Sequence, residues 1–441
     1  MLPSYSPRYA DVWPQVRTAI TDAWPRTLAI YPGLPKPFTA SIPGTDMLFY
    51  WDTYFTHLGL LQEPKGVQMA RDNIDDLLAQ VETRGFIPNA NHPWGVNRSQ
   101  TPFLAQMVRD WYQQAPDKDL PWLSAAFATL RKEYAFWTDG LPQTIESHAT
   151  PISNLYRFSH HATPPELLSF YNTILVPRLS LPDGIADAEK IRRASPYLAE
   201  GETGWDFTPR FEERCSDFAG LDLNVNLCLY EEIFAWMAVE TGCPVDPRWQ
   251  ERARQRKKLI QTLFWDEKRG FFADYDFVNQ RPARVASAIT FCPLWAGLAT
   301  DEQARRVRDI FAVLEGDFGL SACEPSDRPR RYQWDHPALW PPLTWWAVSG
   351  LRRYGYEADA LRLAMKYLDV VAKNFVQPDP ADGVKTRFPG QRVAGKVWEK
   401  FTVDGRINDF EYVADEQQGW TAGVFIALHE WVKERLNRSK P

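Results

Sequence analysis

Hydrophobic residues recur with helical spacing along most of the chain. In residues 66–82 apolar side chains return every three or four positions, so they share one face of a helix. The segments with this spacing are 66–82, 223–237, 304–314, 358–371 and 420–431. Thr300 and Gln303 form a capping box just before the third of these segments. The pattern predicts an all-α protein.

Less regular spacing predicts further helices at about 12–28, 51–62, 99–115, 120–138, 248–264, 286–297 and 342–353. Short connections between helices favour antiparallel neighbours, and helix pairs repeated around a circle form a toroid. No Gly/Ser-rich linker divides the chain, so we expect one domain over residues 1–441. Residues 140–204 are rich in Pro, Ser and His, which predicts a lid-like insertion. We expect the polar motifs on loops that follow the helices.

Aromatic residues are unusually frequent, with 19 Trp, 17 Tyr and 25 Phe in 441 residues. Sugar-binding clefts use such rings as flat platforms, and a Trp-rich core explains the composition equally well. The net charge is −6 with both signs dispersed, which argues against nucleic acid or an anionic membrane as a partner. A small neutral substrate fits this charge best.

The five cysteines are widely spaced and form no CxxC pair, which is typical of reduced, buried thiols. The first residues lack an apolar signal core, and no run of about 18 apolar residues occurs, so we expect a cytoplasmic protein. The seven His are scattered without a zinc-binding spacing. Nucleotide-binding and GxSxG motifs are absent, so we expect no metal and no cofactor. The oligomeric state stays open.

One carboxylate, Asp206, lies between Trp205 and Phe207 at an apparent loop-to-helix junction. Aromatic neighbours would desolvate the carboxyl and raise its pKa, as a general acid requires near neutral pH. The local alternative is a helix N-cap, a common role for Asp.

Other stretches combine aromatic rings with polar side chains. They are Phe49–Phe55, Asn97–Phe103, Arg331–Pro342, Trp398–Phe401, Phe410–Tyr412 and Gln417–Gly423. A carboxylate among rings suits a sugar platform that also accepts hydrogen bonds from hydroxyls. A capped helix start is the local alternative for the first two stretches.

Six stretches, in order along the chain, resemble the signatures of the trehalase family. The matching stretches are Tyr50–Phe55, Asn97–Phe103, Thr203–Phe207, Asp222–Asn224, Gln333–Pro337 and Gly419–Gly423. The turn Trp265–Phe271 also resembles the related family that contains glucosylglycerate and mannosylglycerate hydrolases and processing glucosidase I. Both resemblances imply an (α/α)6 toroid and glycoside hydrolysis with inversion at the anomeric carbon.

By this resemblance Asp206 matches the general acid and Glu399 the general base, with Glu411 as the competing base. The positions that match substrate-binding residues are Tyr50, Trp51, Asp52, Asn89, Arg98, Gln100, Glu166, Trp205, Gln333, Trp334, Asp335, Trp340, Glu411 and Trp420. Trp51, Trp334 and Trp340 are expected to pack on the sugar.

Two arginines of the trehalase pattern are missing. The stretch Pro43–Met47 reads Pro-Gly-Thr-Asp-Met, and Pro164 stands where the pattern has Arg before Pro-Glu. Each lost guanidinium removes charge-assisted bonds of about 1.5–3 kcal/mol. The substrate therefore stays open between trehalose, another short α-glucoside such as kojibiose, and a glycerate-linked sugar, for which Arg98 or a lid arginine would be the donor.

Two other functions remain as alternatives. A phosphorylase would need a basic pocket beside Glu399, and in sequence only Lys396 and Lys400 are near. A sugar-binding protein without catalysis would keep the toroid, but the presence of both candidate carboxylates argues against it.

Overall fold

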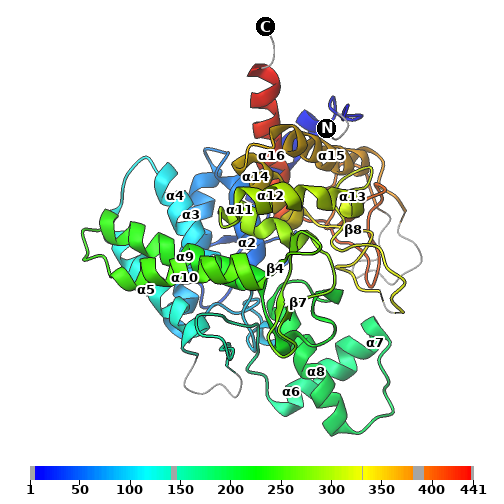
Figure 1. The fold of residues 1–441 in the computed structure, drawn as a ribbon. Helices are drawn as coiled ribbons and strands as arrows, with labels where there is room; N and C mark the ends of the chain where they lie inside the picture. Colours follow the sequence, from blue (N-terminus) through cyan, green and yellow to red (C-terminus); the bar gives the residue numbers. More distant parts are fainter. Residues whose placement is uncertain (1–4, 141–146, 330, 381–391, 439–441) are drawn as a thin grey trace.

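The computed structural model describes residues 5–140, 147–329, 331–380 and 392–438. Within this part, six largely buried helices pack side by side in chain order into a closed inner ring (Figure 1). These inner helices are α2 (Tyr50–Leu60), α4 (Leu104–Gln114), α9 (Leu221–Glu240), α11 (Cys292–Ala296), α14 (Pro341–Arg353) and α16 (Trp420–Arg438).

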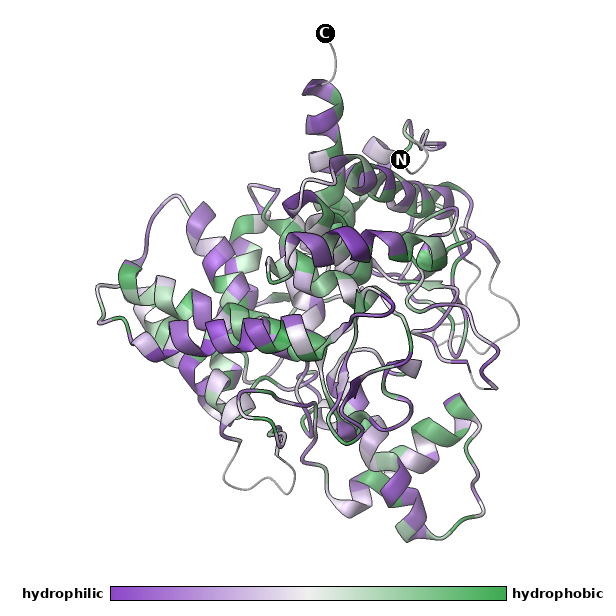
Figure 2. Cartoon of the chain, viewed as in Figure 1, coloured by the Kyte–Doolittle hydropathy of each residue, from purple (hydrophilic) through white to green (hydrophobic). Residues whose placement is uncertain are grey.

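The outer helices are amphipathic and cover this ring. They are α1 (Trp13–Ala23), α3 (Gly66–Arg84), α5 (Leu120–Thr138), α10 (Pro247–Leu263), α12 (Asp301–Val307) and α15 (Glu357–Val376). Figure 2 colours much of α10 as hydrophilic. The capping box at Thr300 and Gln303 is present, but the helix expected over 304–314 is interrupted by a 3-10 turn at Arg308–Ile310 before α13 (Phe311–Leu314).

The ring closes where α16 packs against α2. A Cβ on Gly423 would lie 2.0 Å from the carbonyl oxygen of Phe55, and one on Gly59 would lie 2.7 Å from Cα of Gly423. Only glycine permits such a close crossing of two helix backbones. The second glycine of the motif Gly419–Gly423 therefore serves helix packing.

The segment expected to be a lid is mostly helical. It contains α6 (Pro164–Phe170), a π-helical turn (Tyr171–Leu175), α7 (Val176–Leu179) and α8 (Asp187–Glu202), and it lies at the lower right of Figure 1. These helices have a hydrophobic cluster of their own, with Tyr171, Leu175 and Leu198 at its centre. Residues 141–146 of the expected insertion lie outside the described residues. A single domain with a lid stays a prediction.

Short antiparallel strands join the loops. They are β1 (Leu28–Ala29) with β2 (Phe38–Thr39), β3 (Phe218–Ala219) with β6 (Tyr275–Asp276) and β7 (Arg281–Pro282), β4 (Trp265–Asp266) with β5 (Phe271–Phe272), and β8 (Ala338–Leu339) with β9 (Phe401–Thr402). In the last pair Leu339 lies opposite Phe401. This pairing brings the loop around Gln333 close to Glu399.

The cysteines are free, and four are buried, as expected for structural thiols. Cys243 is exposed, because it follows the C-terminal end of α9 at the surface, so the prediction of burial was wrong for this residue. Among the described residues, no helix combines the length and the apolar character needed to cross a membrane.

Candidate active site

The predicted site residues gather where the inner helices begin. Asp52 lies in the first turn of α2, Trp340 is the N-cap of α14, and Trp420 is the first residue of α16. Asp206, Gln333 and Glu399 lie on connections that follow helices, as expected, whereas Asp52 and Trp420 lie within the helices themselves. Inner helices of a ring all point the same way, so their first turns meet at one end of the toroid.

Asp206 lies in the turn between α8 and a 3-10 helix at Pro209–Phe211. Thr208 caps that 3-10 helix with its side chain, so the N-cap alternative for Asp206 is excluded. The Asp206 side chain is 41% exposed, whereas Trp205 and Phe207 are buried away from solvent. The desolvation expected from these two rings is absent, because their planes pack into the protein and leave the carboxylate facing the site.

Arg178 lies on α7 of the helical insertion and contacts both Asp206 and Glu411. Its Nη1 donates to Oδ2 of Asp206 at 2.9 Å, and its Nη2 donates to the backbone oxygen of Asp206 at 2.6 Å. Its Nε donates to Oε2 of Glu411 at 3.0 Å. Arg178 was not among the predicted site residues, because no local pattern distinguishes it from other arginines of this segment.

Glu399 is fixed through its backbone and one side-chain oxygen. Trp420 Nε1 donates to the Glu399 carbonyl at 3.0 Å, and the Tyr412 hydroxyl donates to Oε1 at 2.8 Å. Oε2 is buried and meets no hydrogen-bond partner among the described residues. Burial raises the pKa of this carboxyl, and the charge of Lys400 opposes the shift. Glu399 therefore keeps one oxygen available for a ligand.

Glu411 has no such free oxygen. Its Oε1 accepts from the backbone N–H of Gln333 at 2.8 Å, and its Oε2 accepts from Arg178. The side chain is 1% exposed, and burial raises its pKa against the effect of Arg178. Its backbone φ of 66° lies in the left-handed region, which is uncommon for Glu.

Gln333 links Asp206 to Lys400, the residue that follows Glu399. Its Nε2 donates to the backbone oxygen of Asp206, and its Oε1 accepts from Lys400 Nζ at 3.2 Å. Lys400 also lies over the Tyr412 ring at 3.2 Å from its centroid. Burial lowers the pKa of Lys400 to about 8. Lys400 and Tyr412 are therefore further site residues, and their place beside Glu399 and Glu411 in sequence was the available signal.

Asp52 completes a group of three interacting carboxyls. It is 5% exposed, and burial raises its pKa well above the usual range, with a smaller contribution from the charges of Glu399 and Asp206. Carboxyls that share one region cannot all ionise without cost. The arrangement suits proton transfer more than structural support.

Arg98 is buried and has only neutral partners. Its Nη1 donates to Oδ1 of Asn97 at 2.9 Å, and its Nη2 donates to Oδ1 of Asn89 at 3.3 Å. Its Nε is buried without a partner among the described residues. Burial lowers the pKa of this guanidinium, and Asp206 and Glu202 oppose the shift by charge alone. Arg98 therefore has no carboxylate in direct contact within the described part of the chain, and its guanidinium suits a polar ligand.

The tryptophans form a buried stack. Trp334 stacks on Trp340 at 3.8 Å and on Trp205 at 5.0 Å between ring centroids. Trp51, Trp334 and Trp340 are 1% exposed or less. The expectation that these three rings offer a free face to a sugar was wrong for this structure, because protein atoms cover them. Their role here is to hold the site: Trp340 Nε1 donates to the Gln333 carbonyl at 3.2 Å.

Some predicted binding residues have structural partners instead. The Tyr50 hydroxyl accepts from the backbone N–H of Phe103 at 2.9 Å and donates to Glu133, inside the ring. Gln100 Oε1 accepts from the backbone N–H of Trp51 at 3.1 Å, at the start of α2. Buried helix starts need acceptors for their first N–H groups, and both side chains supply one.

Glu166 and Asp335, also predicted to bind substrate, have local hydrogen-bond partners. Glu166 is exposed and completes a capping box with Thr163 at the start of α6, with its Oε2 2.7 Å from the Thr163 nitrogen. Asp335 Oδ1 accepts from Arg328 at 2.7 Å and from the backbone N–H of His336 at 2.7 Å. The local hydrogen bonds account for both carboxylates.

Metal binding was not expected from the sequence. Among the residues that the structure describes, no group of three or more His, Cys, Asp or Glu side chains is arranged to hold a metal ion.

Comparison with known proteins places the chain in a family. The family model described as Trehalase matches residues 10–432. The chain belongs to the trehalase family. The resemblance seen in the motifs, the (α/α)6 fold and the glycoside hydrolase class are thereby confirmed.

Individual relatives agree with this assignment. The chain is 30% identical to a periplasmic trehalase of Pseudomonas aeruginosa over 95% of this chain and 75% of that protein. It is 31% identical to a cytosolic neutral trehalase of Kluyveromyces lactis over 91% of this chain, but spans only 57% of that protein.

Solved structures share the fold. The neutral trehalase of Saccharomyces cerevisiae matches with a TM-score of 0.71 and 28% identity, over 99% of this chain and 83% of that chain. A GH63 mannosylglycerate hydrolase from Thermus thermophilus matches with a TM-score of 0.62 and 18% identity, over 94% of this chain and all of that chain. At that identity the second likeness concerns the fold alone.

Proposed function

We propose that this protein hydrolyses a short α-glucoside with inversion at the anomeric carbon, and that trehalose is its substrate. Asp206 gives its proton to the glycosidic oxygen while the bond from that oxygen to the anomeric carbon breaks. Glu399 takes a proton from a water molecule that attacks the opposite face of the sugar, so the product is β-glucose. The relatives named trehalases support the choice of trehalose.

The observation that carries the proposal is the contrast between the two glutamates. Glu399 has a buried oxygen without a partner among the described residues, and its pKa is raised toward the range where a carboxylate is an effective base. Both oxygens of Glu411 are already bonded, so Glu411 positions Arg178 and Gln333. We therefore assign the base to Glu399.

A second candidate substrate is a glycerate-linked sugar. Arg178 has its nitrogens bonded to Asp206 and Glu411, so it offers little to a substrate carboxylate. Arg98 lacks a carboxylate partner within ion-pair distance in the described part of the chain. A substrate with a carboxylate would find its partner there.

The location of the protein stays a prediction. Named relatives include both a periplasmic and a cytosolic trehalase. The free cysteines favour a reducing compartment, so we propose the cytoplasm.

The test measures glucose release from trehalose, glucosylglycerate and mannosylglycerate by wild type, Asp206→Asn, Glu399→Gln and Glu411→Gln. We expect wild type to cleave trehalose, with β-glucose as the first anomer seen by proton NMR. Asp206→Asn and Glu399→Gln should lose turnover by about 10²–10⁴-fold. Glu411→Gln should lose less. Wild-type turnover by Glu399→Gln, or α-glucose as the first product, would contradict the mechanism.

A further inference from the structure

Two aromatic rings stay accessible near the candidate active site. Among the Phe, Tyr and Trp side chains that the structure describes, Trp94 and Phe410 are the most exposed, at 47% and 36%. Protein atoms cover Trp51, Trp334 and Trp340, the rings that were expected to pack on the sugar. A sugar that stacks on an aromatic face in this region therefore has Trp94 or Phe410 as its partner.

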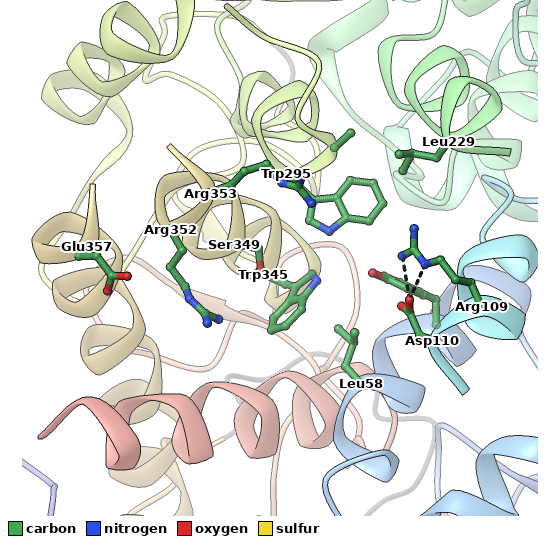
Figure 3. Close-up of a pocket in the computed structure, with 12 residues that line it drawn as sticks. Leu58, Arg109, Asp110, Leu229, Trp295, Trp345, Ser349, Arg352, Arg353 and Glu357 are labelled. Atoms are coloured by element: carbon green, nitrogen blue, oxygen red, sulfur yellow. Dashed lines mark hydrogen bonds and ion pairs between the residues drawn. The ribbon is translucent and has the colours of Figure 1, made fainter. Parts of the chain in front are cut away.

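The two rings lie at the end of the toroid where the site residues gather. Trp94 lies on the connection from α3 to the first turn of α4, and Phe410 on the connection from α15 to the first turn of α16. A cavity of about 490 Å³ belongs to the other end, because later turns of α2, α4 and α14 line it (Figure 3). Its indole rings, Trp295 and Trp345, therefore line that cavity and not the candidate site.

A short, tight loop holds Trp94 beside Arg98. The Trp94 carbonyl accepts a hydrogen bond from Arg98 Nη1 at 3.3 Å, and the guanidinium carbon lies 6.0 Å from the centroid of the Trp94 ring. The ring also contacts Phe49, the N-cap of α2, at 5.8 Å between centroids. Gly95 keeps the loop tight, because a Cβ there would lie 2.7 Å from the Ala90 nitrogen. The indole is thus carried on a closely packed backbone.

Trp94 lies on the side of the proposed acid. Its neighbour Arg98 packs on Gly201 of α8, where an added Cβ would lie 3.1 Å from Arg98 Nε, and α8 leads directly into the turn that holds Asp206. The charge of Asp206 also opposes the lowering of the pKa of Arg98. Trp94 and Arg98 therefore flank the region into which Asp206 donates its proton.

Phe410 lies on the side of the proposed base instead. Its carbonyl accepts from Nζ of Lys400, the residue after Glu399, at 3.4 Å. The Arg331 guanidinium carbon lies 4.9 Å from the centroid of the Phe410 ring. In an inverting hydrolase the acid protonates the oxygen that bears the leaving group, and the base lies across the scissile sugar. The leaving group therefore lies on the side of Trp94.

On the basis of the proposed hydrolysis, we propose that Trp94 binds the leaving sugar and selects glycosides whose leaving group is a sugar ring. The apolar C–H face of that ring packs on the indole, while Arg98 donates hydrogen bonds to its hydroxyl groups. A glycerate group offers a carboxylate to Arg98 but no ring face to Trp94. The substrate class is thereby narrowed to short disaccharides such as trehalose and kojibiose.

The experiment compares substrates with and without a leaving sugar on wild type, Trp94→Ala and Trp94→Phe. Trehalose and kojibiose release a sugar, whereas α-glucosyl fluoride releases only fluoride when water replaces it at the anomeric carbon. We expect Trp94→Ala to lower kcat/KM about tenfold for the disaccharide that wild type cleaves. Its kcat/KM for α-glucosyl fluoride should stay within about twofold of wild type. Trp94→Phe should restore most of the disaccharide activity because it keeps a ring.

Controls separate this role from the hydrolysis itself. Leu120→Ala changes a side chain of α5 with a similar exposure, 45%, and should leave both kinds of substrate unchanged. Glu399→Gln should lose activity on both. If Trp94→Ala changes kcat/KM equally for both kinds of substrate, or for neither, the role of Trp94 is overturned while the hydrolysis stands. Wild type that cleaves only α-glucosyl fluoride also overturns it, and wild type that cleaves no substrate overturns the proposed function as well.

Discussion

The Arg178 guanidinium donates a hydrogen bond to Oδ2 of Asp206 at 2.9 Å. The candidate acid is therefore held by a residue of the helical insertion and not by its own loop. Because the same guanidinium reaches Glu411, it ties the insertion to the C-terminal part of the chain.

Replacing Arg178 by Ala should lower both stability and activity. Glu411 would stay buried without its cation, which costs roughly 3 kcal/mol. Urea unfolding and kcat/KM on trehalose measure the two effects. Arg192→Ala, on the same segment but 71% exposed, is the matched control and should stay within about 0.5 kcal/mol of wild type. Equal effects of the two variants would show that Arg178 is an ordinary surface residue.

Lys400 should give kcat/KM an alkaline limb. Its pKa is about 8, so above that pH Lys400 loses a proton. The positive charge beside Glu399 is then lost, and the hydrogen bond that Lys400 donates to Gln333 becomes weaker. We expect kcat/KM to fall with an apparent pKa of about 8 in wild type and to lack this limb in Lys400→Met.

The expected fall in kcat/KM above about pH 8 cannot come from unfolding that is linked to the titration of Lys400. The folded pKa is below the usual 10.5, so between about pH 8 and 10.5 the folded state binds fewer protons than the unfolded chain. The contribution of Lys400 to stability therefore rises with pH in this window. Lys396→Met, 43% exposed, should keep the limb. A limb that persists in Lys400→Met would assign it to another group.

Glu133 should make stability depend on pH. Burial raises its folded pKa to about 7 from 4.5, although the Tyr50 and Tyr230 hydroxyls oppose the shift. The folded state therefore keeps a proton that the unfolded chain releases, and stability falls as pH rises from about 4.5 to 7. The fall amounts to roughly 3 kcal/mol for this group.

Urea unfolding at pH 4.5 and 8 tests this contribution. Glu133→Gln should lose less stability between these two pH values than wild type does. Glu240→Gln, on the exposed end of α9, should follow wild type. Identical pH dependence in Glu133→Gln and wild type would mean that Glu133 is ionised throughout.

Gly423→Ala should destabilise the ring closure. The added methyl would lie 2.0 Å from the Phe55 carbonyl oxygen, so α16 has to move away from α2. Overpacking of this kind costs about 1–3 kcal/mol. Gly184→Ala, whose Cβ would meet no atom within 4 Å, is the control and should leave Tm nearly unchanged. A wild-type Tm for Gly423→Ala would mean that the crossing is loose.

The helices that cover the ring were predictable because one side faces water. In α3 and α15 the alternation of apolar and polar faces determines both the helix and its buried side. The helices of the insertion were not predicted, because α6 and α7 are short and Pro residues begin α6 and interrupt α8. Glu166 shows a different failure: its capping box with Thr163 follows the same rule that correctly predicted Thr300 with Gln303.

The order of motifs made Asp206 and Glu399 the candidate acid and base, but their partners come from distant segments. Arg178 is recognised only once α7 lies beside Asp206. The burial of Trp334 depends on two rings from different parts of the chain, Trp205 and Trp340. Sequence patterns report which residues are present, whereas access to a ring face depends on the tertiary packing.

The contact between α2 and α16 also affects how the chain is made. The ribosome synthesises α2 early and α16 last among the inner helices, so the face of α2 that Gly423 covers has no partner during most of synthesis. At 5–20 residues per second this interval lasts about 20–80 s. A nascent chain therefore exposes apolar surface for that time, and chaperone binding to α2 is the expected protection.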